Sequence, residues 1–408
     1  MNFKKATLPA ISLLLASSVW SSGLKSDLRL SGFVSTGYLE SSHYNYPADT
    51  EGGTTAFSEL GLNASWTPKD RLTVNGQIFA FELGPYGNYD PMVDYLFLDY
   101  NVKREFGVRF GRVKREQGIY THVQDIDLSR TSILLPIGMY DQRFRDISAA
   151  LDGASLYGNI DLWNDAYLDY VVYGGVVELE PDGGVGGVAL TAMSQAADNL
   201  AVEYIEAADN RGAQLWLSPG IDGLRIGFGV TEMSEVEAAI TGSISAYHPN
   251  PYFAGLPLRS EFSDFTLKIE QLSLEYFVGE WNLTSEYAES TTSYDAVSSI
   301  AGTVVSGGPG KSKARTWYAS LARRLGRFEA AVTYSEENGG GLLSSGGPDS
   351  VTEDMQLSLR YDVTDFWTLK TEVHSLFGTS RLFNEFNQNP IRSERNWTLF
   401  AAKSTFFF

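Results

Sequence analysis

Residues 355–363 read Met-Gln-Leu-Ser-Leu-Arg-Tyr-Asp-Val, a strict alternation of apolar and polar side chains. Residues 224–231 and 59–66 repeat this alternation, as Leu-Arg-Ile-Gly-Phe-Gly-Val-Thr and Glu-Leu-Gly-Leu-Asn-Ala-Ser-Trp. Successive side chains of a β-strand point to opposite faces, so each stretch has one apolar and one polar face. The pattern predicts strands that separate an apolar environment from a polar one.

This alternation recurs along the chain and predicts sixteen strands, with connections that alternate in length. The predicted strands are 28–40, 55–66, 72–81, 92–102, 105–114, 149–157, 167–175, 211–217, 224–231, 264–277, 281–288, 315–323, 328–335, 354–363, 367–377 and 395–408. The short connections are 67–71, 103–104, 158–166, 218–223, 278–280, 324–327 and 364–366; the long ones are 41–54, 82–91, 115–148, 176–210, 232–263, 289–314, 336–353 and 378–394. An even strand number with this alternation is typical of an all-β, transmembrane antiparallel β-barrel with short periplasmic turns and long extracellular loops. The alternative, a soluble secreted β-sandwich adhesin, would mix turn lengths at both ends.

The first residues predict a secreted protein. Lys4 and Lys5 precede an uncharged, mostly apolar run at 6–20, and small residues follow it at 21–23. This order predicts a signal peptide over residues 1–23, cleaved between 21 and 24, and a single barrel domain over 24–408. No later apolar run reaches 18 residues, so we expect strands rather than helices to cross a membrane.

Composition excludes several functions. The 408 residues include no Cys, so the chain has no disulfide framework and no thiolate metal site. A formal net charge of −19 argues against nucleic acid as a partner, because binding phosphates requires clustered Lys and Arg. Apolar residues make up 43% of the chain and aromatic residues 13%, which favours an ordered protein over an acidic disordered one.

One predicted strand, 264–277, does not keep a single alternation. Phe265, Leu267 and Ile269 have one parity, whereas Leu272, Leu274 and Tyr276 have the other. A β-bulge near residues 270–271 would bring all six side chains to the same face.

Two stretches resemble the porins of Gram-negative bacteria. Residues 400–408, Phe-Ala-Ala-Lys-Ser-Thr-Phe-Phe-Phe, are similar to the last strand of that family, which ends in an aromatic residue, here Phe408. Residues 107–114, followed by Gly-Ile-Tyr at 118–120, resemble the strand before the loop that narrows the pore. The chain has Glu-Gln at 116–117 where many relatives carry Pro-Phe, and it lacks the acidic, glycine-rich constriction motif of the general enteric porins.

The resemblance implies a sixteen-stranded, water-filled channel in the outer membrane of a Gram-negative bacterium. It further implies a homotrimer, contacts with outer-membrane lipid and lipopolysaccharide, recognition of Phe408 by the outer-membrane assembly machinery, and small hydrophilic solutes as the transported molecules. It does not identify the residues at the narrowest point of the pore.

Loop 115–148 is the first candidate site. It combines charges of both signs with an apolar stretch, Ile-Leu-Leu-Pro-Ile at 133–137, as expected of a loop that packs on the wall and exposes charges to water. By the resemblance it is the third extracellular loop, and opposite charges across a narrowing would orient dipolar solutes. A surface loop with paired charges is the alternative. The candidate constriction residues are Asp125, Asp127, Arg130, Asp141, Arg143, Arg145 and Asp146.

The lumen wall is the second candidate site. Alternation places seven acids and four bases on the inner face, which predicts a weak preference for cations. Many of them are equally explained as solvated residues paired across strands. These residues are Glu59, Asp99, Glu275, Glu286, Glu329, Asp362 and Glu372, with Arg109, Arg225, Arg360 and Lys370.

Two other loops suggest short helices at the mouth. In loop 176–210, residues 193, 197, 200, 204 and 205 have helical spacing. In loop 232–263, Ser234 and Glu237 fit a capping box for a second helix. Loop 176–210 also carries seven acids and no Lys or Arg, so it is either a divalent-cation site beside lipopolysaccharide or a solvated, repulsive loop.

Signals for catalysis are weak, and we expect neither an enzyme nor a cofactor or metal. His374 and Glu372 are the only inward pair that an outer-membrane hydrolase would offer, and residues 308–312 fail as a phosphate-binding loop because position 305 is Val. We expect a porin for passive diffusion of small hydrophilic solutes and ions. A substrate-selective channel is the main alternative, and a barrel hydrolase is a further one.

Overall fold

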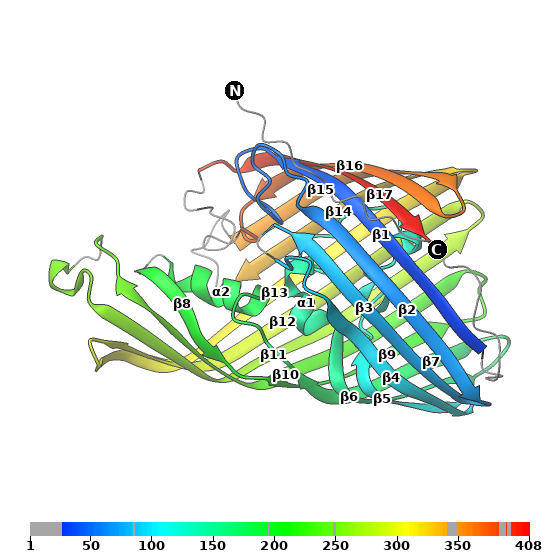
Figure 1. Ribbon diagram of the computed structural model, residues 1–408, viewed down its shortest axis with the longest axis horizontal. Coiled ribbons are helices and arrows are strands. Elements are labelled where there is room, and N and C mark those ends of the chain that lie inside the picture. The colour runs from blue at the N-terminus through cyan, green and yellow to red at the C-terminus, as the bar shows by residue number, and fades with distance from the viewer. Residues whose placement is uncertain are drawn as a thin grey trace.

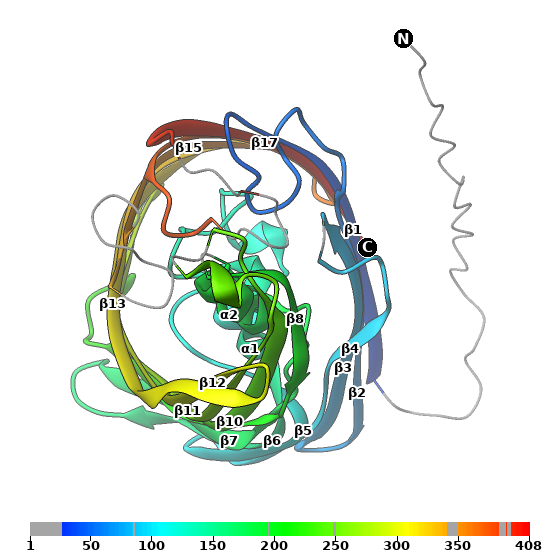
Figure 2. The ribbon, with the colours of Figure 1, turned by 90° about the vertical axis from the view of Figure 1, so that its left-hand side faces the viewer.

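The computed structural model describes residues 27–84, 86–194, 196–247, 250–340, 350–382, 389 and 393–408. The predicted signal peptide, residues 1–23, lies outside them and stays a prediction. Sixteen strands form a closed antiparallel barrel in which the last strand pairs with the first (Figures 1 and 2). The predicted all-β barrel is therefore confirmed.

The barrel strands are β1 (Asp27–Ser41), β2 (Phe57–Lys69), β3 (Leu72–Leu83), β4 (Met92–Lys103), β5 (Phe106–Lys114), β6 (Ala150–Asp161), β7 (Tyr167–Val177), β9 (Ala208–Ser218), β10 (Leu224–Ile244), β11 (Pro257–Val278), β12 (Trp281–Ile300), β13 (Thr303–Leu325), β14 (Phe328–Gly340), β15 (Val351–Thr364), β16 (Trp367–Gly378) and β17 (Asn396–Phe407). A shorter strand, β8 (Ala197–Ile205), pairs with β10 beyond the end of β9. The helices are η1 (Thr121–Val123), η2 (Asp127–Ser129), η3 (Gln142–Phe144), α1 (Arg145–Ser148), α2 (Gly184–Met193) and η4 (Pro251–Phe253). Neither described α-helix has the length and apolar character that crossing a bilayer requires.

The barrel is apolar outside and polar inside. On β15, Leu357 and Leu359 are about half exposed, whereas Gln356, Ser358 and Arg360 are buried on the inner face. Exposed apolar side chains on the other strands complete a belt that meets lipid. They include Leu60, Leu62, Leu96, Leu98, Phe110, Leu156, Val172, Ile226, Phe228, Leu272, Val332, Val373, Phe400 and Phe406.

The C-terminal residue closes the barrel. The backbone N–H of Phe408 donates to the carbonyl of Gly32 (3.0 Å), and the N–H of Gly32 donates back to the carbonyl of Phe408 (2.9 Å). A Cβ added to Gly32 would lie 2.5 Å from the Phe408 ring, so this position of β1 requires glycine.

Strands β10 to β13 are much longer than the sequence indicated. The predicted loops 232–263 and 289–314 are wrong, because most of their residues extend these strands, which project beyond the rest of the barrel in Figure 1. Ala301 and Gly302 alone connect β12 to β13, both with positive φ. Ser234 and Glu237 lie within β10 and cap no helix. The projecting segments are rich in polar residues and glycine, so they lack the apolar alternation that marks a strand in lipid.

The connection between β7 and β9 also differs from the prediction. The helix in this connection is α2, which ends at Met193, and the residues with helical spacing that follow belong to β8. Figure 2 shows α1 and α2 inside the ring of strands.

The bulge expected near residues 270–271 is absent from β11. The register with β10 is continuous from Leu267 to Tyr276, and the irregularity lies instead between Ser263 and Thr266. Leu267 and Ile269 therefore share the inner face with Gln271. Residues 272, 274 and 276, which have the other parity, lie on the outer face. Apolar side chains line part of the barrel interior as a result.

Candidate functional site

Loop 115–148 crosses the interior of the barrel. The backbone N–H of Ile119 donates to Glu286 of β12 (2.9 Å). Farther along the loop, the N–H groups of Ile133 and Leu134 donate to Glu372 of β16 (2.7 and 2.8 Å). The loop therefore lies inside the barrel and contacts strands far from β5 and β6, between which it is inserted.

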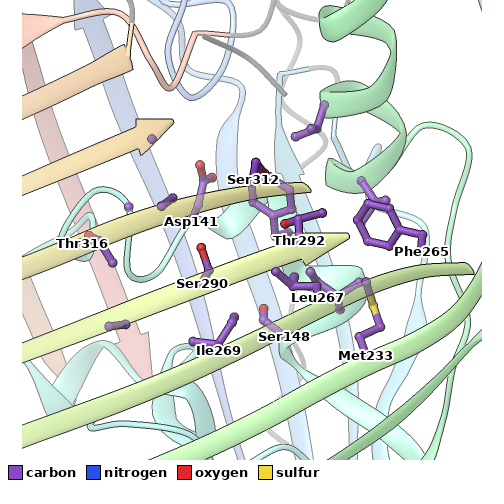
Figure 3. Close-up of a pocket in the computed structure, with 18 of the residues that line it drawn as sticks. Asp141, Ser148, Met233, Phe265, Leu267, Ile269, Ser290, Thr292, Ser312 and Thr316 are labelled. Carbon is purple, nitrogen blue, oxygen red and sulfur yellow. The ribbon is translucent and has the colours of Figure 1, made fainter. Parts of the chain in front are cut away.

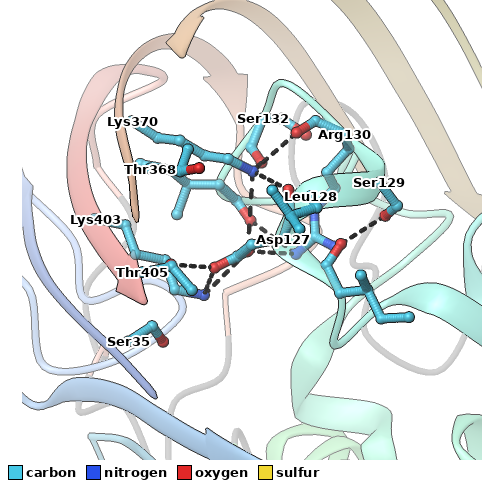
Figure 4. A network of polar contacts seen from close by, with 12 residues as sticks. Ser35, Asp127, Leu128, Ser129, Arg130, Ser132, Thr368, Lys370, Lys403 and Thr405 are labelled. Atoms are coloured by element: carbon cyan, nitrogen blue, oxygen red, sulfur yellow. Dashed lines mark hydrogen bonds and ion pairs between the residues drawn. The ribbon is translucent and has the colours of Figure 1, made fainter. Parts of the chain in front are cut away.

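A cluster of cations holds the middle part of this loop, near η2 (Figure 4). The buried carboxylate of Asp127 accepts from Thr405 (2.6 Å), lies 3.0 Å from Lys403 Nζ and 3.5 Å from Arg130 Nη2. Lys370 donates to three backbone carbonyls of the loop, at 2.6, 2.9 and 3.0 Å. Burial alone would raise the pKa of Asp127, but the three cations outweigh it and hold the pKa below its usual range. This site joins η2 firmly to β16 and β17.

Glu372 belongs to a second buried network. Its carboxylate accepts from Ser358 and Gln356 as well as from the loop, and it contacts His374 Nε2 (3.0 Å). His374 Nδ1 lies 2.7 Å from Asp354. Both ring nitrogens thus contact carboxylates, and neither is left to activate a serine hydroxyl, as a hydrolase would need.

The other candidate constriction residues form ion pairs too. Arg145 contacts both Asp94 of β4 and Asp125 of the loop. Asp141 and Arg143 form a buried pair of 2.6 Å, and the pKa of Asp141 is lowered because Arg143 outweighs the effect of burial.

Asp146 is the exception among these residues. It is partly buried in α1, and its buried Oδ2 has no hydrogen-bond partner among the described residues. Burial raises the pKa of Asp146 to about 7, and the nearby Glu180 and Asp182 act in the same direction. A Cβ added to Gly183 would lie 2.3 Å from Oδ2, so the carboxyl group packs directly against the start of α2.

The predicted wall residues lie on the inner face in ion pairs or hydrogen bonds. Arg109 contacts Asp99 (3.1 Å) and Glu116 (2.5 Å), and Arg225 contacts Glu275 (2.9 Å). The remaining contacts, several of them to the loop, are Glu59 to Lys403, Glu329 to Thr131 and Arg324, Arg360 to Asp362 and to the carbonyl of Leu128, and Glu286, Lys370 and Glu372 as described above. The wall charges are therefore largely neutralised in pairs, and the transverse field expected from the sequence is correspondingly weakened.

A cavity of about 820 Å³ lies between the loop, α2 and strands β10 to β13 (Figure 3). One side is apolar and includes Met233, Leu267 and Ile269 together with α2. The next two strands of the same wall, β12 and β13, contribute hydroxyl groups. Those labelled in Figure 3 belong to Ser290, Thr292, Ser312 and Thr316.

Three hydrogen-bonded side chains, Tyr140, Glu286 and Tyr318, connect the lining of this cavity with that of a smaller one of about 40 Å³. Tyr140 lines the larger cavity and Tyr318 the smaller. Both hydroxyl groups donate to Glu286, whose carboxylate also accepts from Ser273 (2.6 Å) and Gln271 (2.8 Å). Sequence reasoning placed Glu286 on the wall but missed this cluster and the cavity. The signal for the cavity was the change of parity in 264–277, which was interpreted as a bulge.

Comparisons with known proteins give the fold. Neither a scan against protein-family models nor a search of curated proteins finds a match. An anion-selective porin from Comamonas acidovorans matches with a TM-score of 0.55 and 12% identity, over 94% of this chain and 100% of that chain. The outer-membrane OmpT of Vibrio cholerae matches with a TM-score of 0.51 and 11% identity, over 96% of this chain and 100% of that chain. OmpF of Salmonella typhi, in complex with daunomycin, matches with a TM-score of 0.50 and 14% identity, over 93% of this chain and 97% of that chain.

Sequence identities this low support an assignment of the fold and of nothing further. The chain has the fold of the bacterial porins, a closed sixteen-stranded β-barrel. Its exposed apolar belt is the outer surface expected of a barrel that spans a membrane.

Proposed function

We propose that this protein is an outer-membrane channel for passive diffusion of small hydrophilic solutes and ions. The observation that carries the proposal is loop 115–148, which crosses the interior of a barrel whose inner wall is polar. A loop held inside such a barrel narrows the path for solutes without coupling their passage to energy.

Constriction residues of the loop and other charged residues have different roles in this proposal. Asp125, Asp127, Arg130, Asp141 and Arg143 fix the loop through buried ion pairs. Partly exposed charges, such as those of Arg109 and Glu116 and of Arg225, face the solute path. Because most charges are paired, the channel discriminates weakly between ions, with a slight preference for cations from the excess of wall acids.

The decisive experiment removes residues 125–140 and measures single-channel conductance in planar bilayers. We expect larger conductance and passage of larger sugars, because the deleted residues occupy the lumen. The matched control shortens the projecting β12–β13 hairpin by deleting 295–298 and 306–309, which pair with each other. The control should conduct like the wild type. Unchanged conductance after the loop deletion, in a barrel that still assembles, would contradict the proposal.

The proposed assembly is a homotrimer in contact with outer-membrane lipid and lipopolysaccharide, with Phe408 as the signal for the assembly machinery. The exposed apolar belt supports contact with lipid, and cross-linking of the protein in native membranes tests the trimer. We further propose that the protein performs no covalent chemistry. The support is the engagement of both His374 nitrogens, and an esterase assay on the purified barrel tests it.

A further inference from the structure

The 820 Å³ cavity has the size of a small-molecule site, and its two sides differ in chemistry. Met233, Leu267 and Ile269 form an apolar floor on β10 and β11. Ser290 and Thr292 lie on the neighbouring strand β12, where they pair with Ile269 and Leu267, and offer hydroxyl groups on the same wall. A solute with both an apolar body and a polar end matches this lining better than a sugar, which is polar all round.

Most charges that line the cavity are already paired. The lining contains two acids, Asp141 and Glu337, and four bases, Arg115, Lys311, Arg315 and Arg381. Asp141 contacts Arg143, Glu337 contacts Arg381, and Arg315 contacts Glu289. Among the described residues, no carboxylate forms an ion pair with Arg115 or Lys311. The lining therefore holds two cations without a carboxylate partner and no unpaired carboxylate, although the chain as a whole is acidic.

Of the two cations without a carboxylate partner, Arg115 is the buried one. Its side chain donates to the carbonyl of Ile147 (2.7 Å) and to Gln117 (2.7 Å), two neutral acceptors. Its Nε has no hydrogen-bond partner among the described residues. A buried guanidinium without a counter-ion costs free energy, and a bound anion would recover it through charge-assisted hydrogen bonds.

We propose that this cavity binds an organic monoanion with an apolar body, such as an aryl carboxylate, on its way through the channel. The carboxylate contacts Arg115, and the apolar body packs on Met233, Leu267 and Ile269. The inference rests on the proposed channel function and names the solute class that the channel favours.

The test compares three probes in single-channel recordings: 3-phenylpropanoate, propanoate and 3-phenylpropylammonium. Propanoate lacks the aromatic body, and 3-phenylpropylammonium has the opposite charge. We expect the concentration of 3-phenylpropanoate that halves the current to be at least about tenfold below that of either other probe. Equal values for the three probes would overturn the proposal.

Variants separate the two halves of the site. Arg115→Gln should abolish the preference for 3-phenylpropanoate over the ammonium probe, whereas Arg115→Lys should keep most of it. Leu267→Ser should reduce the preference over propanoate. Its matched control, Leu272→Ser, makes the same change on the lipid face of the same strand and should leave the preference unchanged. Equal effects of the two serine substitutions would overturn the proposal, even if the Arg115 variants fail to assemble.

A binding measurement distinguishes this inference from the channel function. Equilibrium dialysis of labelled 3-phenylpropanoate against wild-type barrels in lipid nanodiscs requires no conductance. Channels that conduct but neither bind nor prefer this probe would leave the channel function standing and overturn the inference. Barrels that bind it saturably, with loss of binding in Leu267→Ser, but do not conduct would support the site and contradict the channel function.

Discussion

The two sides of the barrel interior hold loop 115–148 in different ways. Toward β14 to β17 and β1, buried charges such as Lys370, Glu372 and Lys403 bind the loop directly and leave little space. Toward β10 to β13, only Glu286 of β12 is described above as a buried charge that binds the loop. The rest of this inner face, beside α2, carries mainly apolar and hydroxyl side chains, and the 820 Å³ cavity separates them from the loop.

The difference shows what decides where an inserted loop docks. Buried charges are stable only when paired or hydrogen-bonded, so a wall rich in inward charges requires a partner that covers it. Glu372 accepts hydrogen bonds from two backbone N–H groups of the loop, and Lys370 donates to three of its carbonyls. Apolar and hydroxyl side chains impose no such requirement, so space for a solute remains beside them.

The largest expected effect is on the charged side. Asp127→Ala leaves Lys403, Lys370 and Arg130 in a buried site without their carboxylate, which should lower the free energy of unfolding by about 3–5 kcal/mol. Denaturant titration of the barrel in lipid vesicles measures this loss. Asp152→Ala, which removes a half-exposed partner of Arg112, is the control and should cost at most about 1 kcal/mol. A similar loss in both variants would contradict the distinction between the two sides.

The second prediction tests the outer face on the cavity side. Ile226 of β10 is 42% exposed to the surroundings of the barrel, so Ile226→Arg should cost about 2–4 kcal/mol if the residue lies near the bilayer midplane. Arg225→Gln, on the inner face, keeps a hydrogen-bond donor for Glu275 and should cost less than about 1 kcal/mol. The two variants are compared by the yield of folded barrel on refolding into vesicles. Equal yields would contradict the assignment of inner and outer faces.

The third prediction concerns the contact between α1 and α2 beside the cavity. The folded protein keeps the proton of Asp146 up to about pH 7, whereas an ordinary Asp loses it near pH 4. The folded state is therefore progressively destabilised as pH rises from 4 to 7, where the unfolded chain has already ionised. Asp146→Asn should stabilise the barrel by about 1–3 kcal/mol at pH 8 and have little effect at pH 4. Denaturant titrations at both pH values measure this difference, and Asp161→Asn, at an exposed residue, is the control. An effect of Asp146→Asn that is the same at pH 4 and pH 8 would mean that Asp146 titrates normally.

The smallest expected effect is ion selectivity. Among the wall residues predicted from the sequence, acids outnumber bases by seven to four, which favours cations, but most of these charges are paired. We expect a small reversal potential of cation sign in a potassium chloride gradient, decreasing as salt rises above about 0.1 M, where charges are screened beyond about 10 Å. A clear anion preference for chloride itself would mean that Arg115 and Lys311 govern small ions as well as organic anions.

The sequence determined the barrel by itself. In lipid, every strand must show an apolar face outward, so alternation such as that of residues 355–363 appears directly in the order of side chains. Sixteen strands, the inner location of residues such as Glu372 and Arg225, and the long insertion at 115–148 all follow from that local rule. Where strands leave the bilayer, as in 232–244 and 303–314, the rule lapses and the prediction of loops was wrong.

Only the tertiary structure decided how the interior is filled. The partners of Asp127 come from the loop itself, from β16 and from β17, more than 200 residues apart in the sequence. The cavity, in turn, required α2 to lie inside the barrel opposite Leu267 and Ile269, which the predicted bulge placed on the wrong face. Alternation fixes which way a side chain points relative to its own strand. Its contacts depend on the closure of the whole barrel, which brings distant strands and inserted loops together in one interior.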